Sequence, residues 1–491
     1  MGYNFLDCDR EQRFLLPVDM RDWLDRDHPC FFVIDVVDRL DLSDFYASYR
    51  SDGWGRAAFD PKMMVALVLY AYMVGERSTR AIERLATENA AFRILCANRP
   101  PDHSTIARFI ARHEDPLKAL FDQVLSLCVA VGLVKPGVVA IDGTKMCANA
   151  SGARNLTPEQ IRAATDRIFD EARRIDEEED RLYGDARGDE LPEFLRDRKR
   201  RLEWLDEQLE QGNANHNRIN ETDPDSRVMM SPKGFVQGYN AQLAVTETQV
   251  VVAHEVTNEV IDRWRFQPMV TQATDNLAAA GAQDAITTVV ADTGYFTNDN
   301  IEADLGCDVL IAPAAAKDLD SLEAPDDGWA DYEARKQELE QEDERRAQVL
   351  ERAVSKQITM REARDEMGVS TPHIYFLRKR YIEGGADAIR RRPPPMPRKS
   401  PRSVMLDRFT TAEGKATYAK RAVLVEPVIG QTKEARGFRR FMRRGLKACG
   451  TEWALMMTTH NLRKLRAAST ALCSSFAAAC RYLWRPEPVA L

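Results

Sequence analysis

The ten residues from Gly137 to Met146 constrain the fold more than any other stretch of the chain. They contain the apolar run Val138-Val-Ala-Ile141, which lies between Pro136 and Gly143. A strand with one exposed face alternates apolar and polar residues, whereas an unbroken apolar run is typical of a strand buried on both faces. The run therefore predicts a strand inside a covered sheet. Asp142 follows the run, and we expect it at the strand end, where Gly143 allows the backbone to turn.

Further strands are expected later in the chain. Apolar or alternating runs cover residues 235–245, 250–256, 286–291 and 309–312. The first two are separated by four polar residues, which predicts a hairpin, and a helix is expected over 264–280. This order of elements predicts a mixed α/β sheet. Asp292 directly follows the run 286–291, in the same way that Asp142 directly follows the run Val138–Ile141. An acid before a glycine or small residue is also a common turn, so each aspartate alone has a structural alternative.

The length of 491 residues suggests about three domains. The 44% of apolar residues are enough for a sizeable core. Residues 1–135 have the pattern of short helices. Asp60 can cap a helix that starts at Pro61, Ser78 or Thr79 can cap a second, and the segment Pro101–Thr105 breaks the chain and caps a third. A helical scaffold and a domain that binds DNA ends explain this region equally well.

Two helical insertions interrupt the predicted sheet. Residues 157–222 are rich in charge, with apolar residues at heptad spacing, which predicts a helical arm. Within residues 321–405, the segment Ile358–Tyr381 has the plan of a helix-turn-helix, with a turn at Gly368 and a second helix after Ser370. An ordinary helical hairpin is the alternative there.

The predicted fold class is therefore α/β: a mixed sheet flanked by helices, with a helical N-terminal domain and two helical insertions. The catalytic core would consist of three separate segments. These are residues 136–156, 223–320 and 406–480.

The net charge of −8 hides an uneven distribution of charge. Residues 432–449 contain seven Lys and Arg against one Glu, and residues 378–402 contain nine against two acids. Basic stretches of this kind can bind a polyanion although the whole chain is acidic. Arg378 and Arg380, on the second helix of the predicted helix-turn-helix, are candidates for contact with DNA phosphates.

Other classes of protein fit the sequence poorly. The nine cysteines form no C-x-x-C pair and the seven histidines are dispersed, which argues against a disulfide framework, a zinc ribbon and a His-based metal site. The N-terminus lacks the pattern of a signal peptide, and no apolar run is long enough to span a bilayer. We expect a cytoplasmic protein with no membrane partner, associated with the nucleoid when it binds DNA.

Three carboxylates combine into a chemical hypothesis. Asp142 and Asp292 follow predicted strands, and Glu426 precedes a basic segment. Three such acids can hold two divalent ions about 4 Å apart, one activating a water or hydroxyl nucleophile and the other stabilising a departing phosphodiester oxygen. Oxygen ligands suit Mg²⁺ or Mn²⁺ better than zinc.

At these residues the chain resembles the DDE transposases of bacterial insertion sequences, in the branch with a helical N-terminal domain and an RNase H-like core. The resemblance covers nearly the whole chain, and the order of its motifs makes it specific. The motifs are Phe59-Asp-Pro-Lys-Met, Asp102-His-Ser-Thr, Ile141-Asp-Gly-Thr-Lys, Thr222-Asp-Pro-Asp-Ser-Arg, Gly234-Phe-Val-Gln-Gly-Tyr-Asn-Ala-Gln, Ala291-Asp-Thr-Gly-Tyr, Tyr418…Arg421…Glu426…Lys433 and His460-Asn-Leu.

The resemblance implies roles for individual residues. The catalytic triad and metal ligands would be Asp142, Asp292 and Glu426, holding two Mg²⁺ or Mn²⁺ ions. DNA phosphates near the scissile bond would be contacted by Tyr418, Arg421 and Lys433, with Arg436 in the same basic stretch as a further candidate. Four residues separate Arg421 from Glu426, where the commonest form of the family motif has three.

The function implied is DNA transposition. The protein would bind the terminal inverted repeats of its element, cleave phosphodiester bonds and join the 3′-hydroxyl strand to double-stranded target DNA. Two ends must be brought together, so a homodimer is expected in the active complex. The alternatives are an RNase H-like nuclease without strand transfer, and a domesticated DNA-binding protein without catalysis.

Overall fold

The structure is a computed structural model that describes residues 19–50, 57–163, 218–231, 234–313 and 327–475, together with isolated positions between 164 and 217. The chain forms two compact units. The first comprises Met1–Ile311 and Lys415–Leu491, and the second comprises Ala312–Gly414. The predicted helical arm lies largely outside the described residues.

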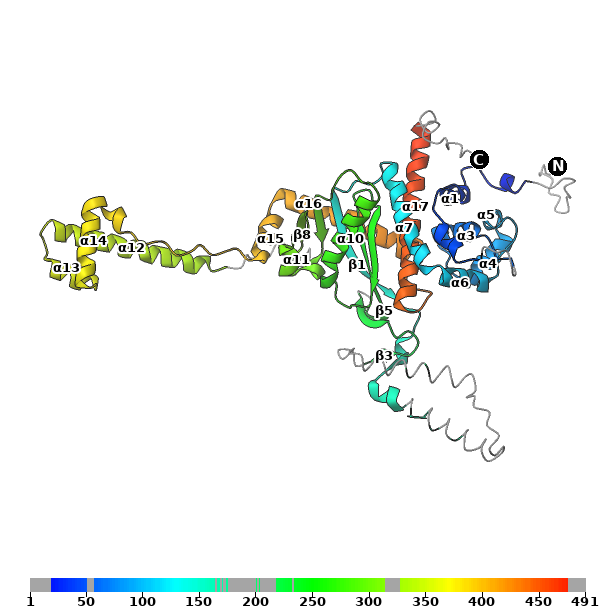
Figure 1. Cartoon of the computed structure of the whole chain (residues 1–491), viewed down its shortest axis with the longest axis horizontal. Helices are drawn as coiled ribbons and strands as arrows, with labels where there is room; N and C mark the ends of the chain where they lie inside the picture. Colours follow the sequence, from blue (N-terminus) through cyan, green and yellow to red (C-terminus); the bar gives the residue numbers. More distant parts are fainter. Residues whose placement is uncertain are drawn as a thin grey trace, which may run out of the picture. The chain divides into compact units, whose positions relative to one another are not determined.

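A mixed sheet forms the centre of the first unit (Figure 1). Its strands are β1 (Val138–Cys147), β4 (Arg227–Ser231), β5 (Gly234–Val245), β6 (Val251–Thr257), β7 (Thr288–Ala291) and β8 (Asp308–Ile311). The strand order is β4-β5-β1-β7-β8, and β6 also pairs with β5. The pairs β1/β5, β5/β6 and β4/β5 are antiparallel, whereas β1/β7 and β7/β8 are parallel. The predicted α/β class with a mixed sheet and a β5–β6 hairpin is confirmed.

The first strand differs from its prediction. β1 does not end at Asp142 but continues to Cys147, and Gly143 pairs with Gln242 of β5 as part of the ladder. The expected turn at Gly143 is therefore wrong. The parallel ladder with β7, however, stops at Ala140. Asp142 thus lies just beyond the last β1/β7 pair, and Asp292 directly follows β7, so both acids stand where the parallel strands separate.

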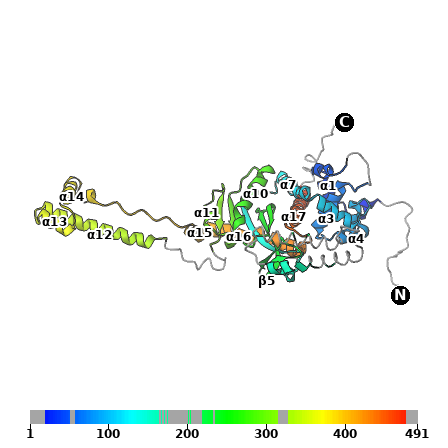
Figure 2. The same cartoon turned by 60° about the horizontal axis from the view of Figure 1, so that its bottom comes forward.

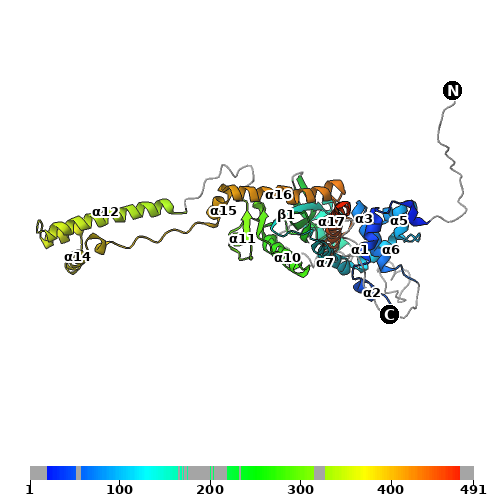
Figure 3. The ribbon, with the colours of Figure 1, turned by 90° about the horizontal axis from the view of Figure 1, so that it is seen from above.

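Helices cover both faces of this sheet. Figure 3 shows α16 (Ala412–Gly430) along one side and α10 (Phe266–Ala279) on the other. α10 packs on β5 and β6, and α17 (Leu446–Ser475) packs on β6 and on α7 (Glu114–Ala130). The side chain of Asn461 on α17 both accepts from the backbone nitrogen of Val251 and donates to its carbonyl, at 2.9 and 2.8 Å. These two hydrogen bonds from the Asn461 side chain attach α17 to β6.

The N-terminal region is helical, as predicted. Its helices are α1 (Pro29–Val37), α2 (Ser43–Ala47), α3 (Pro61–Val74), α4 (Thr79–Glu88), α5 (Ala90–Leu95), α6 (His103–Arg112) and α7. The expected N-caps are confirmed, because the side chains of Asp60, Ser78 and Asp102 each accept a hydrogen bond from the first turn. Helices α1, α3 and α7 gather near α17 (Figures 1 and 2), and the Arg77 guanidinium reaches the buried Glu452 of α17 at 2.9 Å.

Three of the residues singled out in the sequence lie on one long helix. α16 already contains Tyr418, Arg421 and Glu426, and it continues into a π-helical turn, η7 (Gln431–Ala435). After η7 the basic segment is not helical at Phe438 and Phe441, and both rings are buried. Pro427 is tolerated inside α16, as a proline can be where a helix distorts.

The second unit contains the expected pair of short helices. It has α12 (Trp329–Val354), α13 (Met360–Met367), α14 (Thr371–Gly384), η6 (Ala386–Ile389) and α15 (Pro401–Thr410). Gly368 ends α13 with a left-handed backbone, φ 63°, and Ser370 stands at the N-cap of α14. A small core joins α12, α13, α14 and η6, formed by Val349, Leu350, Ala353, Ala363, Ile374, Leu377 and Ile389. No helix among the described residues is long and apolar enough to cross a membrane.

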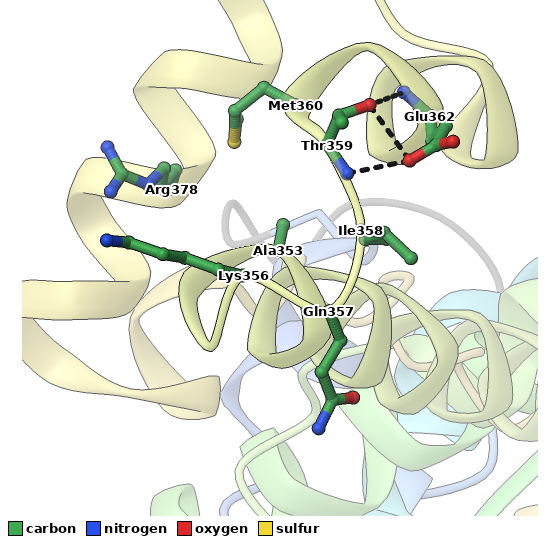
Figure 4. A pocket seen from close by; sticks show the side chains of 8 residues that line it. All are labelled: Ala353, Lys356, Gln357, Ile358, Thr359, Met360, Glu362 and Arg378. Carbon is green, nitrogen blue, oxygen red and sulfur yellow. Dashed lines mark hydrogen bonds between the residues drawn. The ribbon is translucent and has the colours of Figure 1, made fainter.

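A hollow opens between these helices (Figure 4). Two cations, Lys356 and Arg378, line it, and Thr359 and Glu362 close one side through the capping box of α13. The remaining lining residues are Ala353, Gln357, Ile358 and Met360. The hollow belongs to the packing of the second unit and contains none of the predicted catalytic acids.

Candidate active site

Three acidic side chains approach a single guanidinium group in the first unit. Arg421 Nη2 lies 2.7 Å from Asp142 Oδ2 and 3.6 Å from Asp292 Oδ2, and Arg421 Nη1 lies 3.9 Å from Glu426 Oε1. These acids come from three separate segments of the chain, and they are the three that the sequence singled out. The tertiary fold therefore brings them together around one cation.

Local backbone bonds aim the two aspartates. Asp142 Oδ1 accepts from the Gly143 nitrogen at 2.8 Å, which leaves Oδ2 for Arg421. Asp292 is the N-cap of η4 (Thr293–Tyr295), and its Oδ1 accepts from the Gly294 nitrogen at 2.9 Å. In each residue one oxygen is held by the following backbone and the other faces the shared guanidinium.

The site runs from the protein interior to the surface. The side chain of Asp142 is 13% exposed, that of Asp292 38% and that of Glu426 61%. The pKa of Asp142 is raised to about 7, chiefly by burial and also by the charges of Asp292 and Asp262, while Arg421 and the Gly143 nitrogen lower it. The main cause of the raised pKa is therefore burial, and the neighbouring acids add to it.

Arg421 is held by electrostatics rather than by a full set of hydrogen bonds. Burial lowers its pKa, but the charges of Asp142 and Asp292 outweigh burial and raise the pKa of Arg421 above its usual value. Its Nε is buried and, among the described residues, has no hydrogen-bond partner. The arginine is therefore charged, and one of its five donors is left unused.

The carboxylates of Asp142, Asp292 and Glu426 are chemically suited to bind a divalent cation. All the groups are carboxylate oxygens, the ligands that Mg²⁺ and Mn²⁺ prefer. In this structure the Arg421 guanidinium supplies positive charge to these oxygens. Within the described part of the chain, no three His, Cys, Asp or Glu side chains are already arranged as a metal site.

Tyr418 and Lys433 flank the acids on the same helix and its extension. Tyr418 stands one turn before Arg421, and burial raises the pKa of its phenol. Lys433 Nζ donates to the backbone carbonyl of Lys145 in β1 at 2.8 Å. Lys433 thus contacts the strand that carries Asp142, and the charges of Asp292 and Asp142 add to the raised pKa of Tyr418.

Arg436 occupies a different environment from the one predicted. It is buried, and its guanidinium donates to Thr432 Oγ1, Thr459 Oγ1 and the carbonyl of Met456, at 3.0 to 3.1 Å. Burial lowers the pKa of Arg436 to about 9. With its donors used inside the protein, this placement does not support the predicted contact with DNA.

The two arginines of the helix-turn-helix also differ from each other. Arg380 is exposed on α14, with its guanidinium 5.8 Å from the centre of the Phe376 ring. Arg378 is half-buried and lines the hollow of Figure 4. Of the two, Arg380 has the better access to a ligand.

A fourth acid, Asp262, escaped the sequence interpretation. Its Oδ1 accepts from Lys145 Nζ at 3.0 Å, and also from the side-chain amides of Asn240 and Gln242. Asp262 directly precedes a short helix, η3 (Arg263–Arg265), where an aspartate is usually an N-cap. That ordinary explanation hid it. Two polar residues at alternate positions of a buried strand, Asn240 and Gln242, were the sequence signal that a polar partner such as Asp262 faces β5.

The Thr222–Arg227 motif has a structural role. Asp223 is buried and accepts from the Tyr239 hydroxyl at 2.7 Å and from the Gly445 nitrogen at 3.1 Å. Asp225 accepts from the backbone nitrogen of Leu446 at 2.8 Å. The two aspartates therefore fasten the start of α17 to the sheet.

Comparison with known proteins supplies three matches. A family model described as Transposase domain (DUF772) matches residues 18–112, one described as Helix-turn-helix domain matches 345–399, and one described as Transposase DDE domain matches 390–466. The last match contains Tyr418, Arg421, Glu426 and Lys433. Searches of curated proteins and of solved structures gave no match. A transposase domain, a helix-turn-helix and a DDE domain following one another along one chain identify its family: the chain belongs to the DDE transposases of insertion sequences.

Proposed function

We propose that this transposase cleaves DNA at the ends of its element and joins the resulting 3′-hydroxyl to target DNA, with Asp142, Asp292 and Glu426 as its catalytic acids. The observation that carries the proposal is the convergence of these acids on Arg421, at 2.7, 3.6 and 3.9 Å. The mixed sheet supports an RNase H-like core, since its acids stand where β1 and β7 separate.

Mg²⁺ or Mn²⁺, held as two ions by the three acids, would supply Lewis acidity to the attacking and departing oxygens of the phosphodiester. The chain itself supplies charge and position. Asp142 contributes a buried carboxylate, and the more exposed Glu426 closes the site from the solvent side. Arg421, once displaced from the acids by the ions, would be available to contact the phosphate.

The basic segment beside the site supports contact with DNA. The backbone of Arg439 and Phe441 hydrogen-bonds to Cys147, so this segment runs along the end of β1. Arg439, Arg440 and Arg444 are exposed there, and Lys433 is half-buried next to them. These cations would hold the phosphate backbone, while sequence would be read elsewhere.

The helix-turn-helix is the best candidate for that reading. The second helix of such a motif presents its N-terminal half to the major groove. On α14 this half carries Tyr375 and Phe376, both 53% exposed, followed by the exposed Arg380. Arg380→Ala should weaken binding to specific ends, whereas Arg361→Ala on the exposed face of α13 should leave it unchanged.

The direct test uses the full chain, labelled duplexes taken from the DNA on either side of its gene, and Mg²⁺ or Mn²⁺. Cleaved and strand-transferred products are expected, together with a dimer on paired ends. Cleavage without joining would indicate a nuclease, and binding without cleavage would indicate a DNA-binding protein that has lost catalysis. Either result would overturn the proposal.

A further inference from the structure

Asp262 lies between β6 and η3, at a position where its side chain could cap a helix. Its carboxylate makes no capping bond to η3 in the described part of the chain. It turns instead toward β1 and β5, with its side chain 24% exposed. Because the Asp262 carboxylate accepts no hydrogen bond from the described first turn of η3, other groups must hold it in place.

Those partners come from two strands. Asp262 Oδ1 accepts from Lys145 Nζ at 3.0 Å, from Asn240 Nδ2 at 2.6 Å and from Gln242 Nε2 at 2.8 Å. Gln242 Nε2 also donates to Asn240 Oδ1 at 2.9 Å. Asn240 and Gln242 are fully buried, so the carboxylate is fixed in position by a charged group and two immobile amides.

The two oxygens of Asp262 lie over the two glycines that neighbour the catalytic aspartates. A β-carbon on Gly143 would overlap the Gln242 amide and come within 2.7 Å of Asp262 Oδ1. A β-carbon on Gly294 would lie 3.6 Å from Asp262 Oδ2 and 3.0 Å from Asp292 Oδ1. Gly143 is therefore needed for close approach, because its missing side chain makes room for Gln242 and Asp262, whereas at Gly294 the tight neighbour is Asp292 itself and Asp262 lies in ordinary contact.

The hydrogen bonds around Asp262 extend to the segments next to each of the three proposed catalytic acids. Gln242 Oε1 accepts from the hydroxyl of Tyr295, which is the last residue of η4 and is buried. Lys145 follows Asp142 in β1, and its carbonyl accepts from Lys433 of η7, the extension of α16. Asp262 thus lies at the centre of contacts to β1, η4 and the end of α16.

We propose that Asp262 is a positioning residue of the acidic site, which sets the separation of Asp142 and Asp292 and adds negative charge that favours divalent cations. This inference rests on the proposed function of that site. Residues that orient metal ligands typically change metal affinity by about 10- to 100-fold when they are mutated.

The test measures Mn²⁺ affinity by calorimetry on the full chain, beside thermal stability and DNA cleavage. Asp262→Ala should weaken Mn²⁺ binding at least about 10-fold. Asp262→Asn keeps an acceptor for Lys145, Asn240 and Gln242 but loses the charge, so a smaller loss is expected. Asp275→Asn, on the exposed face of α10, is the matched control and should bind Mn²⁺ as the wild type does.

Excess Mn²⁺ should restore cleavage to the Asp262→Asn protein, because the catalytic acids themselves are intact. Wild-type Mn²⁺ affinity in a folded Asp262→Ala protein would overturn the inference. If Asp262→Ala does not fold, wild-type affinity in Asp262→Asn together with unrestored cleavage would overturn it. Failure of the wild-type chain to bind Mn²⁺ and cleave DNA would instead refute the proposed function.

Discussion

Arg421 Nη2 and Asp142 Oδ2 are 2.7 Å apart, so the most buried acid of the site is paired with a cation that the protein itself provides. The same guanidinium faces Asp292 and Glu426. In the absence of metal, this arrangement lowers the repulsion among three acids. Divalent cations bound by these acids, as proposed above, would compete with Arg421 for the same oxygens.

Arg421→Gln should therefore tighten Mn²⁺ binding in the absence of DNA, by about 10-fold if removing the competing charge is worth about 1.4 kcal/mol. The same variant should cleave DNA more slowly, because it loses a cation near the phosphate. Calorimetry with Mn²⁺ and a cleavage assay measure the two effects.

Lys420→Gln is the matched control for this experiment. Lys420 neighbours Arg421 but pairs with Glu247 at 2.6 Å on the surface. Its loss should leave Mn²⁺ affinity unchanged. Weaker Mn²⁺ binding in Arg421→Gln would contradict the competition between the arginine and the metal.

Replacing any of the three acids by its amide should remove cleavage while DNA binding persists. Metal-based charge stabilisation supplies several kcal/mol, so Asp142→Asn, Asp292→Asn and Glu426→Gln should each lower the cleavage rate by about 1,000-fold or more. Cleavage of labelled DNA and mobility shifts on the same samples measure both properties. Full activity in any one variant would remove that acid from the proposed triad.

Alanine variants of Arg436 and Arg440 should have different effects, the first on the stability of the fold and the second on DNA binding. Arg436→Ala removes a buried guanidinium with its hydrogen bonds to Met456, Thr432 and Thr459, so unfolding free energy should fall by about 3 kcal/mol. Arg440→Ala, at an exposed position, should keep stability and reduce the salt slope of DNA binding by about 0.9 per lost phosphate contact. Thermal unfolding and salt titrations distinguish the two. The opposite pattern would place Arg436, rather than Arg440, at the DNA.

His460 should make the first unit sensitive to acid. Its Nε2 bonds the carbonyl of Gln249 at 2.8 Å, and burial lowers the pKa of His460 to about 3. The unfolded chain takes up a proton near the ordinary pKa of 6.5 and the folded chain does not. The contribution of His460 to stability is therefore complete above pH 6.5 and is lost as the pH falls toward 3, by about 2 kcal/mol between pH 6.5 and 5.

His460→Gln should flatten the dependence of unfolding free energy on pH by that amount. His103→Gln, in which a 43% exposed side chain is replaced, should keep the wild-type slope. Denaturant unfolding at a series of pH values provides the measurement. An unchanged slope in His460→Gln would show that this histidine is not the acid-sensitive group.

The sequence by itself indicated the α/β class of the fold and singled out the three acids that the structure brings together around Arg421. Unbroken apolar runs such as Val138–Ile141 require burial on both faces, and N-caps such as Asp60 and Asp102 are decided by the residues of their own first turn. Such local causes can be recognised in sequence. The division into four predicted domains and the homodimer were inferred in the same way and stay predictions.

Tertiary structure decided what each polar side chain faces. Arg436 and Arg440 are four residues apart in one basic stretch, yet one is buried against α17 and the other is exposed, because burial depends on segments distant in sequence. Gly143 looked like a turn, but it is a ladder residue that leaves room for Gln242 and Asp262. The convergence of Asp142, Asp292 and Glu426 on Arg421 likewise comes from packing α16 across the ends of β1 and β7. No local sequence pattern contains that arrangement, since it arises from contacts between segments far apart along the chain.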